Sequence, residues 1–238
     1  MQAIARSCGV PDIGLLSLEE VVKRLAQMVE VTTVPIIADA DTGFGNAANA
    51  RCTLHAFERA GVAGLHLEDQ TFPKRCGHLD DKSLDSVEEM VHKIRVFSAA
   101  RHDSDFVIIA RTDAIATHGL DEAISRSHQY LAAGADMIFF EAPETVEQIE
   151  QIAAAIPQPK LINMFYSSKT PIVPKQRLLE LGYKLASIPS DLQRVAISAY
   201  QKVLDVILRD GDSSSLRDEM VSFKDREEIV QTEAYLSL

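Results

Sequence analysis

Six short apolar runs alternate along the chain with amphipathic stretches of helical length, and this alternation constrains the fold more than any other feature. The apolar runs cover residues 34–41, 61–69, 106–114, 135–142, 160–166 and 183–190. The stretches with helical periodicity cover residues 17–31, 47–60, 86–100, 120–133, 146–155 and 174–181. Because the apolar runs are nearly continuous, they predict parallel strands that are covered on both faces. The chain is therefore predicted to be an α/β protein.

Polar side chains follow the apolar runs at the points where the predicted strands end. They are Asp39, Asp41, Glu68, Asp69, Arg111, Asp113, Glu141 and Asn163. In a (β/α)8 TIM barrel the active site lies at the carboxyl ends of several strands. A doubly wound open sheet would also use strand ends, but it often carries a glycine-rich turn, and "DTGFGNAAN" contains neither GxGxxG nor GK[ST]. We favour the barrel family, with about six of its eight strands visible in the chain.

No linker or charge block divides the first part of the chain. We predict an incomplete barrel as the catalytic domain over residues 1–190. Residues 191–238 are predicted to be a helical segment for oligomerisation, with helices at 191–209 and 214–235. The stretch "RDGDSSS" at 209–215 is the expected flexible joint between these two helices.

The composition excludes several classes of partner. The chain has 238 residues, 46 % of them hydrophobic, and a formal net charge of −11, which argues against nucleic acid or an anionic membrane as the main partner. The three cysteines form no CxxC pair, which suits a reducing compartment. No apolar run is long enough to span a bilayer. We expect a cytoplasmic protein, with a mitochondrial location left open.

Three carboxylates predict a metal site. Asp39 and Asp41 are two residues apart at a strand end, so in extended backbone both side chains share one face. Two carboxylates this close repel each other unless a cation binds between them or one of them takes up a proton. With Glu68 at the end of the next run, the three hard oxygen ligands suit Mg²⁺ or Mn²⁺ better than Zn²⁺. The alternative is that these acids cap helices or pair with basic side chains at the barrel rim.

The segment "KRCGH" predicts a group for proton transfer. Cys76 lies between Lys74, Arg75 and His78, and positive neighbours favour the thiolate of a cysteine and bring its pKa toward the working range of an acid or base. The alternative is a structural cysteine, although these usually lie within apolar runs.

Two further side chains have open alternatives. Arg111 can bind a carboxylate or a developing enolate, or it can form an ion pair with Glu68 or Glu141. His66 shares the face of Glu68 and is interpreted either as part of the ligand shell or as a core histidine. The histidines expected on helices or surface loops receive no role; they are His92, His102 and His128.

The motifs "ADADTGFGN", "GLHLEDQTFPKRCGHL", "IIARTDA", "FFEAP" and "INM", in this order and spacing, closely resemble the isocitrate lyase / phosphoenolpyruvate mutase superfamily. The "KRCGH" signature resembles the carbon–carbon lyase branch, which includes methylisocitrate, 2,3-dimethylmalate and petal-death-like lyases. The resemblance implies a Mg²⁺-dependent lyase that cleaves a small 2-hydroxy dicarboxylate to an α-keto acid and a carboxylate. An enzyme of the same superfamily that acts on phosphonates or on oxaloacetate is the alternative.

The resemblance also implies roles for individual residues. Asp39, Asp41 and Glu68 would hold Mg²⁺. Arg111 would stabilise the developing charge, and Cys76, together with His78, would act catalytically from a loop that closes over the site. The residues implied to bind the dicarboxylate or keto-acid substrate are Asp12, His66, Gly77, Glu141 and Asn163. Superfamily members commonly assemble as a dimer of dimers with an exchanged C-terminal helix, for which residues 214–235 are the candidate here.

The chain departs from the superfamily pattern in two places. Relatives begin with two further strands and a helix that lead to a Tyr-x-Ser-Gly-type motif, whereas here "RSCGVPDIG" follows Met1 almost at once. Relatives also carry Asn-Met-Val-Glu-Gly-Gly where this chain reads "NMFYSS". We therefore expect an N-terminally truncated lyase with exposed strand edges at 34–41 and 183–190. An inactive barrel with a binding or oligomer-modulating role is the third hypothesis.

Overall fold

The computed structural model describes residues 2–75, 77 and 81–237. The chain divides into two compact units, residues 1–190 and residues 191–238. Each unit has its own secondary structure, and the residues predicted for the site all belong to the first unit.

The first unit is built on a six-stranded parallel sheet. The strands are β1 (Ile37–Asp39), β2 (Gly64–Glu68), β3 (Val107–Thr112), β4 (Met137–Phe140), β5 (Lys160–Asn163) and β6 (Tyr183–Ser187). Each strand pairs with its neighbour in the chain, in the order β1-β2-β3-β4-β5-β6. A doubly wound sheet reverses its strand order at a switch point, so the observed order confirms the barrel-type interpretation.

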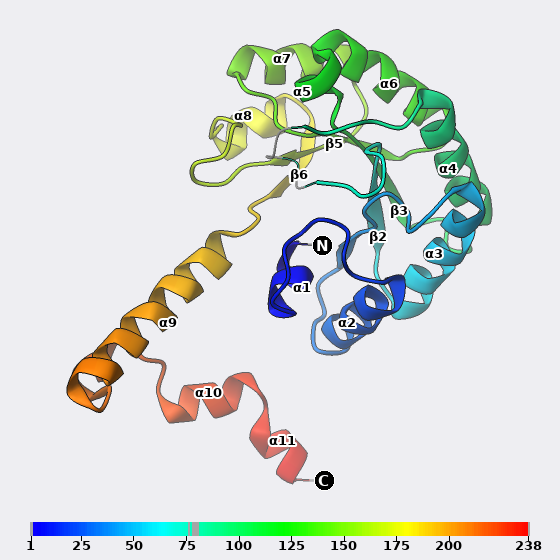
Figure 1. The fold of residues 1–238 in the computed structure, drawn as a ribbon. Coiled ribbons are helices and arrows are strands. Elements are labelled where there is room, and N and C mark those ends of the chain that lie inside the picture. The colour runs from blue at the N-terminus through cyan, green and yellow to red at the C-terminus, as the bar shows by residue number, and fades with distance from the viewer. Residues whose placement is uncertain (1, 76, 78–80, 238) are drawn as a thin grey trace. The chain divides into compact units, whose positions relative to one another are not determined.

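Helices form an outer layer around the strands (Figure 1). The first unit contains the helices α1 (Gln2–Ser7), α2 (Leu18–Glu30), α3 (Ala47–Ala60), α4 (Val87–Ala100), α5 (Ala114–His118), α6 (Leu120–Ala132), α7 (Val146–Ala155) and α8 (Lys175–Glu180). Local sequence explains several boundaries. Ser17 and Asn46 form capping boxes at the starts of α2 and α3, and Gly61 ends α3 with a φ of +82°.

The two faces of the sheet carry different side chains. Leu65 and Leu67 point toward the helices and join the main core, whereas Ile109 and Phe139 belong to a small apolar cluster on the opposite face. Because successive side chains alternate between faces, this opposite face also carries Asp39 of β1, Arg111 of β3 and Asn163 of β5. The apolar cluster thus lies beneath a polar rim at the carboxyl ends of the strands.

The strands are shorter than the apolar runs that predict them. β1 spans Ile37–Asp39, for example, where the run covers 34–41. The runs extend into turns, because a residue just past a strand can be buried without pairing to a neighbouring strand. Helices α1 and α5 were not predicted, and both have fewer than seven residues.

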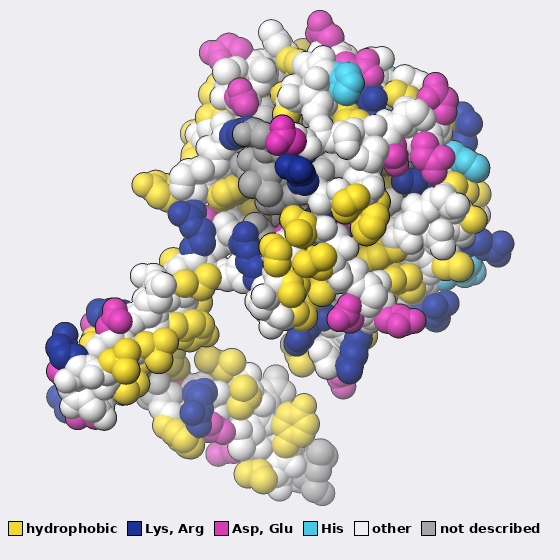
Figure 2. Space-filling view, in the orientation of Figure 1, with side chains coloured by type: hydrophobic (Ala, Val, Ile, Leu, Met, Phe, Trp, Pro, Cys, Tyr) yellow, Lys and Arg dark blue, Asp and Glu magenta, His cyan; other side chains and the backbone are white. Residues whose placement is uncertain are grey.

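The second unit contains α9 (Asp191–Asp210), the 3-10 helix η1 (Ser214–Glu219), α10 (Phe223–Ile229) and α11 (Thr232–Leu236). The prediction of one helix over 214–235 is therefore wrong. The Ser222 side chain caps the start of α10, and Gln231 adopts a left-handed conformation that separates α10 from α11. Helix α9 exposes many apolar side chains, including Leu192, Val195, Tyr200, Leu204 and Leu208 (Figure 2).

Within the part of the chain that the structure describes, no helix combines the length and the apolar character that a membrane crossing requires.

Candidate active site

The carboxylates predicted to bind a metal lie together at the ends of β1 and β2. Asp39 ends β1, and its Oδ1 accepts a hydrogen bond of 2.9 Å from the backbone N–H of Asp41. Asp41 has a φ of +46° and accepts a hydrogen bond of 2.9 Å from the Glu68 N–H through its backbone carbonyl. This turn brings the end of β1 directly beside Glu68, which is fully buried.

Burial and mutual repulsion perturb these acids. Burial, followed by the charge of Asp39, raises the pKa of Asp41 to about 6. Burial also raises the pKa of Glu68 well above its usual value, against the opposing effect of Arg111. Carboxylates in this state bind a proton or a cation more readily than carboxylates in water.

Lys74 supplies one positive charge to this cluster. Its ammonium lies 2.6 Å from Oδ1 of Asp12 and 2.9 Å from Oδ1 of Asp41, and the side chain is almost completely buried. Burial opposes the charged form, but Asp39, Glu68 and Asp41 outweigh it and raise the pKa of Lys74. Lys74 therefore stays protonated and connects the segment after β2 to the carboxylates.

Arg111, near the end of β3, faces three acids. Its Nη1 lies 3.1 Å from Glu68 Oε2, and its Nε lies 3.7 Å from Glu141 Oε2. Asp113 receives two hydrogen bonds, 2.9 Å from Nε and 3.1 Å from Nη2. The guanidinium also lies 5.2 Å from the ring centre of Phe139. The ion-pair alternative for Arg111 is thus present, and it fixes the guanidinium beside the carboxylate cluster.

A second lysine joins Asp113 to the segment that carries the "KRCGH" motif. Lys82 Nζ donates a hydrogen bond of 2.9 Å to Asp113 Oδ1 and one of 2.6 Å to the backbone carbonyl of Gly77. Gly77 packs so closely that a Cβ there would collide with the side chains of Glu141 and Arg111. The backbone at Gly77 therefore lies directly against Glu141 and Arg111.

Asp69 supports the site from behind the sheet. Its carboxylate accepts hydrogen bonds of 2.8 Å from the Thr112 hydroxyl, 2.9 Å from the Asp113 N–H and 2.8 Å from the Tyr130 hydroxyl. Arg126 Nη1 lies 3.3 Å from the same carboxylate. Asp69 is completely buried, so these contacts fix the backbone that positions Asp113.

The remaining predicted binding residues lie on the same rim. His66 Nδ1 is 3.5 Å from Asp39 Oδ1, and burial, with the Arg111 charge contributing, lowers the pKa of His66 to about 4. Asn163 donates a hydrogen bond of 3.3 Å to Glu141 Oε2. His66 is therefore neutral near pH 7 and can accept or donate a hydrogen bond.

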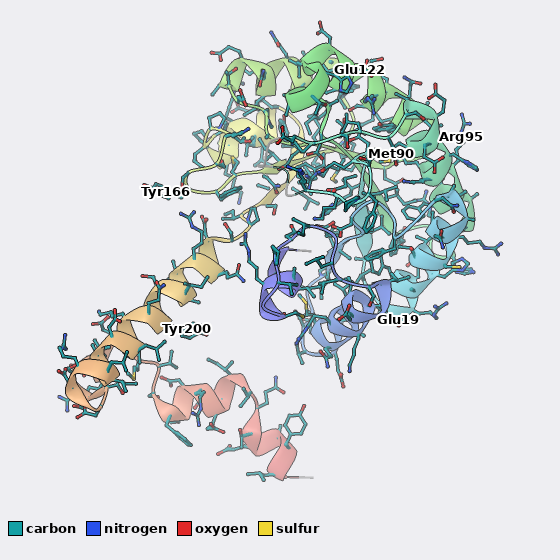
Figure 3. The ribbon with its side chains drawn as sticks, in the orientation of Figure 1. Glu19, Met90, Arg95, Glu122, Tyr166 and Tyr200 are labelled. Atoms are coloured by element: carbon teal, nitrogen blue, oxygen red, sulfur yellow. The ribbon has the colours of Figure 1, made fainter. Side chains whose placement is uncertain are left out.

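The structure brings most of the predicted site residues together. These are Asp12, Asp39, Asp41, His66, Glu68, Gly77, Arg111, Glu141 and Asn163. Cys76 and His78 lie outside the described residues. Tyr166 extends from the loop after β5 and is 76 % exposed (Figure 3).

Sequence reasoning missed the roles of Lys74, Lys82, Asp69 and Asp113. Two signals could have found some of them. Asp69 and Asp113 directly follow other strand-end polar groups, in "LED" and "RTDA", and a buried charge requires a partner. Lys82 and Asp113 are 31 residues apart in the sequence, so no local sequence pattern predicts their ion pair.

The donor set fits a hard divalent cation. Both carboxylate oxygens of Glu68 are buried and accept no hydrogen bond within the described part of the chain. Arg111 forms an ion pair with Glu68 Oε2, and Lys74 forms one with Oδ1 of Asp41. Buried carboxylate oxygens with spare acceptor capacity are the ligands that Mg²⁺ and Mn²⁺ prefer.

The fold and the site together define an α/β-barrel enzyme with an acidic, arginine-containing site at the carboxyl ends of its strands. The family model for phosphoenolpyruvate phosphomutase matches residues 2–208. The chain belongs to the phosphoenolpyruvate mutase / isocitrate lyase superfamily.

The similar curated proteins are carbon–carbon lyases. The chain is 42 % identical to the 2,3-dimethylmalate lyase of Eubacterium barkeri, over 96 % of this chain and 79 % of that protein. It is 43 % identical to the probable 2-methylisocitrate lyase 2 of Corynebacterium glutamicum, over 91 % of this chain and 71 % of that protein. The chain is accordingly a carbon–carbon lyase of this superfamily.

Solved structures with a similar fold include a lyase and two hydrolases. A crystal structure of 2,3-dimethylmalate lyase matches with a TM-score of 0.92 and 31 % identity, over 99 % of this chain and 79 % of the other. Oxaloacetate acetylhydrolase with 3,3-difluorooxalacetate has a TM-score of 0.90 at 30 % identity, covering 98 % and 80 %. Phosphonopyruvate hydrolase with oxalate and Mg²⁺ has a TM-score of 0.87 at 31 % identity, covering 98 % and 81 %.

Proposed function

We propose that the chain is a Mg²⁺-dependent lyase that cleaves a small 2-hydroxy dicarboxylate, of the 2-methylisocitrate or dimethylmalate kind, to an α-keto acid and a carboxylate. The observation that carries this proposal is the cluster of Asp39, Asp41 and Glu68 at neighbouring strand ends, in which both buried oxygens of Glu68 accept no hydrogen bond within the described part of the chain and lie beside Arg111. Similarity to 2,3-dimethylmalate lyase and 2-methylisocitrate lyases supports it.

In this proposal Asp39, Asp41 and Glu68 hold the cation. When bound, Mg²⁺ polarises the carboxylate and hydroxyl oxygens of the substrate and favours loss of the hydroxyl proton. Manganese is the alternative ion, since it takes the same oxygen ligands. Phosphonopyruvate hydrolase was solved with Mg²⁺ and oxalate, which supports the choice of metal.

The chain's own residues bind the substrate and manage its charge. Arg111 is fixed by its two hydrogen bonds to Asp113, so it can stabilise the enolate-like charge that develops as the carbon–carbon bond breaks. The proposed binding residues are Asp12, His66, Gly77, Glu141 and Asn163. Cys76 and His78 are proposed as catalytic residues, with the Cys76 thiol donating its proton to the carbanion carbon.

The test is release of an α-keto acid, followed with a coupled dehydrogenase, from methylisocitrate, dimethylmalate, isocitrate and oxaloacetate. Activity with a 2-hydroxy dicarboxylate should require Mg²⁺ and should fall when Cys76 is changed to serine. A folded protein that turns over none of these substrates with Mg²⁺ would contradict the proposal.

A second candidate reaction is carbon–carbon bond cleavage of oxaloacetate. The match to oxaloacetate acetylhydrolase at a TM-score of 0.90 favours it. The same substrate panel separates the two candidates, because oxaloacetate carries a keto group where the leading substrates carry a hydroxyl. Preferred turnover of oxaloacetate would select the second reaction.

We also propose that the enzyme is a homo-oligomer, a dimer of dimers, assembled through residues 191–238. Helix α9 supports this because Leu192, Val195, Leu204 and Leu208 are exposed on it (Figure 2), and such apolar surface commonly marks an interface. A cytoplasmic location is proposed on the basis of the cysteine pattern.

A further inference from the structure

A second group of metal-ligating side chains lies away from the carboxylate cluster. His55 and Glu58 lie on α3, and His102 lies two residues after the end of α4. One ligand atom from each of the three side chains lies within 4.8 Å of the others. The two imidazole rings are 4.4 Å apart, centre to centre, and inclined by 31°.

Hydrogen bonds identify one donor nitrogen in each ring. His55 Nε2 lies 3.0 Å from the carbonyl oxygen of Ala100. Because a carbonyl only accepts, His55 Nε2 carries the hydrogen, and Nδ1 keeps its lone pair. His102 Nδ1 lies 2.9 Å from Glu58 Oε2, so this nitrogen carries the hydrogen without a metal ion, and it becomes a metal ligand when the hydrogen moves to Nε2 of the same ring.

The carboxylate of Glu58 is fixed in place by backbone donors. Its Oε1 accepts hydrogen bonds of 2.6 Å from the His102 N–H and 3.3 Å from the Asp103 N–H. The Glu58 side chain is only 11 % exposed, whereas that of His102 is 74 % exposed. The group is thus preorganised on its protein side and accessible to ions from solvent.

We propose that His55, Glu58 and His102 form a binding site for a zinc ion, with water completing the coordination. Zinc bonds of about 2.0–2.1 Å at tetrahedral angles place neighbouring ligand atoms about 3.3 Å apart. The 2.9 Å between His102 Nδ1 and Glu58 Oε2 is close to this separation. Zinc binds His102 Nδ1 in the tautomer that carries the ring hydrogen on Nε2, so no net proton is lost from the neutral ring. The carbonyl of Ala100 orients His55 as an outer partner orients a metal-bound imidazole.

The donor types distinguish this site from the carboxylate cluster. Two imidazoles and one carboxylate suit Zn²⁺ and neighbouring first-row ions, while Mg²⁺ prefers oxygen ligands. The site also lies at the opposite edge of the sheet. The C-terminal half of α3 leads to the start of β2, and His102 precedes the start of β3, whereas the carboxylates lie at the strands' other ends.

This location indicates a structural role. A bound ion would join α3 to the connection between α4 and β3, and an ion that binds only the folded chain raises its stability. In barrel enzymes, residues at the amino-terminal ends of the strands typically stabilise the fold, whereas the catalytic residues lie at the carboxyl ends.

The experiment is a Zn²⁺ titration of the full chain, first treated with a chelator, in excess Mg²⁺ against a competing chelating dye. One Zn²⁺ should bind per chain, and His102→Gln should weaken binding by more than about tenfold. His102 is exposed, so this variant should fold. A thermal unfolding midpoint that rises with Zn²⁺ in the wild type and not in His102→Gln provides a second measurement.

Two control variants make the result specific. His128→Gln removes an exposed histidine on α6, and Cys52→Ser removes the thiol one turn before His55 on α3. Both should bind Zn²⁺ as the wild type does. No Zn²⁺ binding in excess Mg²⁺, equal binding by His102→Gln, or loss of binding in either control would overturn the proposal.

Discussion

At the scale of single residues, the site depends on a few side chains with buried charges. Arg111 lies within ion-pair distance of Glu68, Asp113 and Glu141. Asp41 forms an ion pair with Lys74 through its Oδ1. Since each of these groups is buried, the geometry and protonation of one affects the others.

Arg111→Lys should lower kcat/KM by at least about 100-fold, the scale observed when one charge-stabilising donor is removed from an active site. Lysine keeps the charge but cannot form the paired hydrogen bonds to Asp113 while also reaching Glu68. Steady-state kinetics test this. Arg95→Lys, at an exposed position of α4 (Figure 3), should keep wild-type rates, and a comparable loss in that control would contradict the argument.

Mg²⁺ affinity should fall as the pH drops below about 6, the raised pKa of Asp41. Below this pKa a proton occupies the carboxylate and competes with the cation, so the dissociation constant rises by up to about tenfold per pH unit. Calorimetric titrations between pH 5 and pH 8 measure it. Asp41→Asn should bind Mg²⁺ more weakly and lose this part of the pH dependence; an unchanged profile in the variant would exclude Asp41 as its source.

At the scale of elements, the site is held by contacts between strands, helices and connecting segments. Asp69, after β2, reaches Thr112 on β3 and Tyr130 on α6. Lys82 holds the backbone at Gly77 against Asp113. These contacts join segments that are distant in the sequence, so they depend on the packing of the layers.

Asp69→Asn should lower the free energy of unfolding by about 3 kcal/mol, because it removes the buried charged partner of the Arg126 guanidinium and leaves it paired with the more exposed Glu122. Urea denaturation monitored by circular dichroism measures the change. Asp103→Asn, at an exposed position before β3, is the matched control and should change stability little. Equal free energies of unfolding for Asp69→Asn and the wild type would show that the charge of Asp69 makes no net contribution to stability.

Gly77→Ala should reduce kcat/KM by about 100-fold, because the added methyl group would displace Glu141 or Arg111 from its position. The thermal unfolding midpoint should stay near that of the wild type, since Gly77 has no side chain that packs in the core. Gly211→Ala, where a Cβ meets no atom within 4 Å, should keep full activity. Wild-type kinetics in Gly77→Ala would mean that the segment does not contact the site in solution.

At the scale of the whole molecule, the two units have different surfaces. The first unit buries its large apolar residues in one main core between the sheet and the helices. The second unit exposes a row of apolar side chains on α9. An exposed row of this kind is stable in water chiefly when another surface covers it.

Leu204→Asp should shift the protein to smaller species, because a buried charge in an interface without a partner is costly. Light scattering coupled to size-exclusion chromatography measures the mass. Gln201→Asp introduces the same charge on an exposed polar position of α9 and should leave the mass unchanged. A monomeric wild type would contradict the proposed assembly.

The sequence by itself determined the β-α alternation and the strand ends that carry Asp39, Asp41, Glu68 and Arg111, because hydrophobic periodicity and strand-end polarity are local signals. It did not show how residues 214–235 break into shorter helices, since capping side chains compete there with helical propensity.

Only the tertiary structure decided which charges meet. Lys82 reaches Asp113 across 31 residues, and Asp69 reaches Tyr130 across 61. His102, which sequence reasoning left without a role, meets Glu58 across 44 residues. Local patterns carry no record of these pairs, because the pairs form only when helices pack on the sheet and bring distant segments within hydrogen-bond distance.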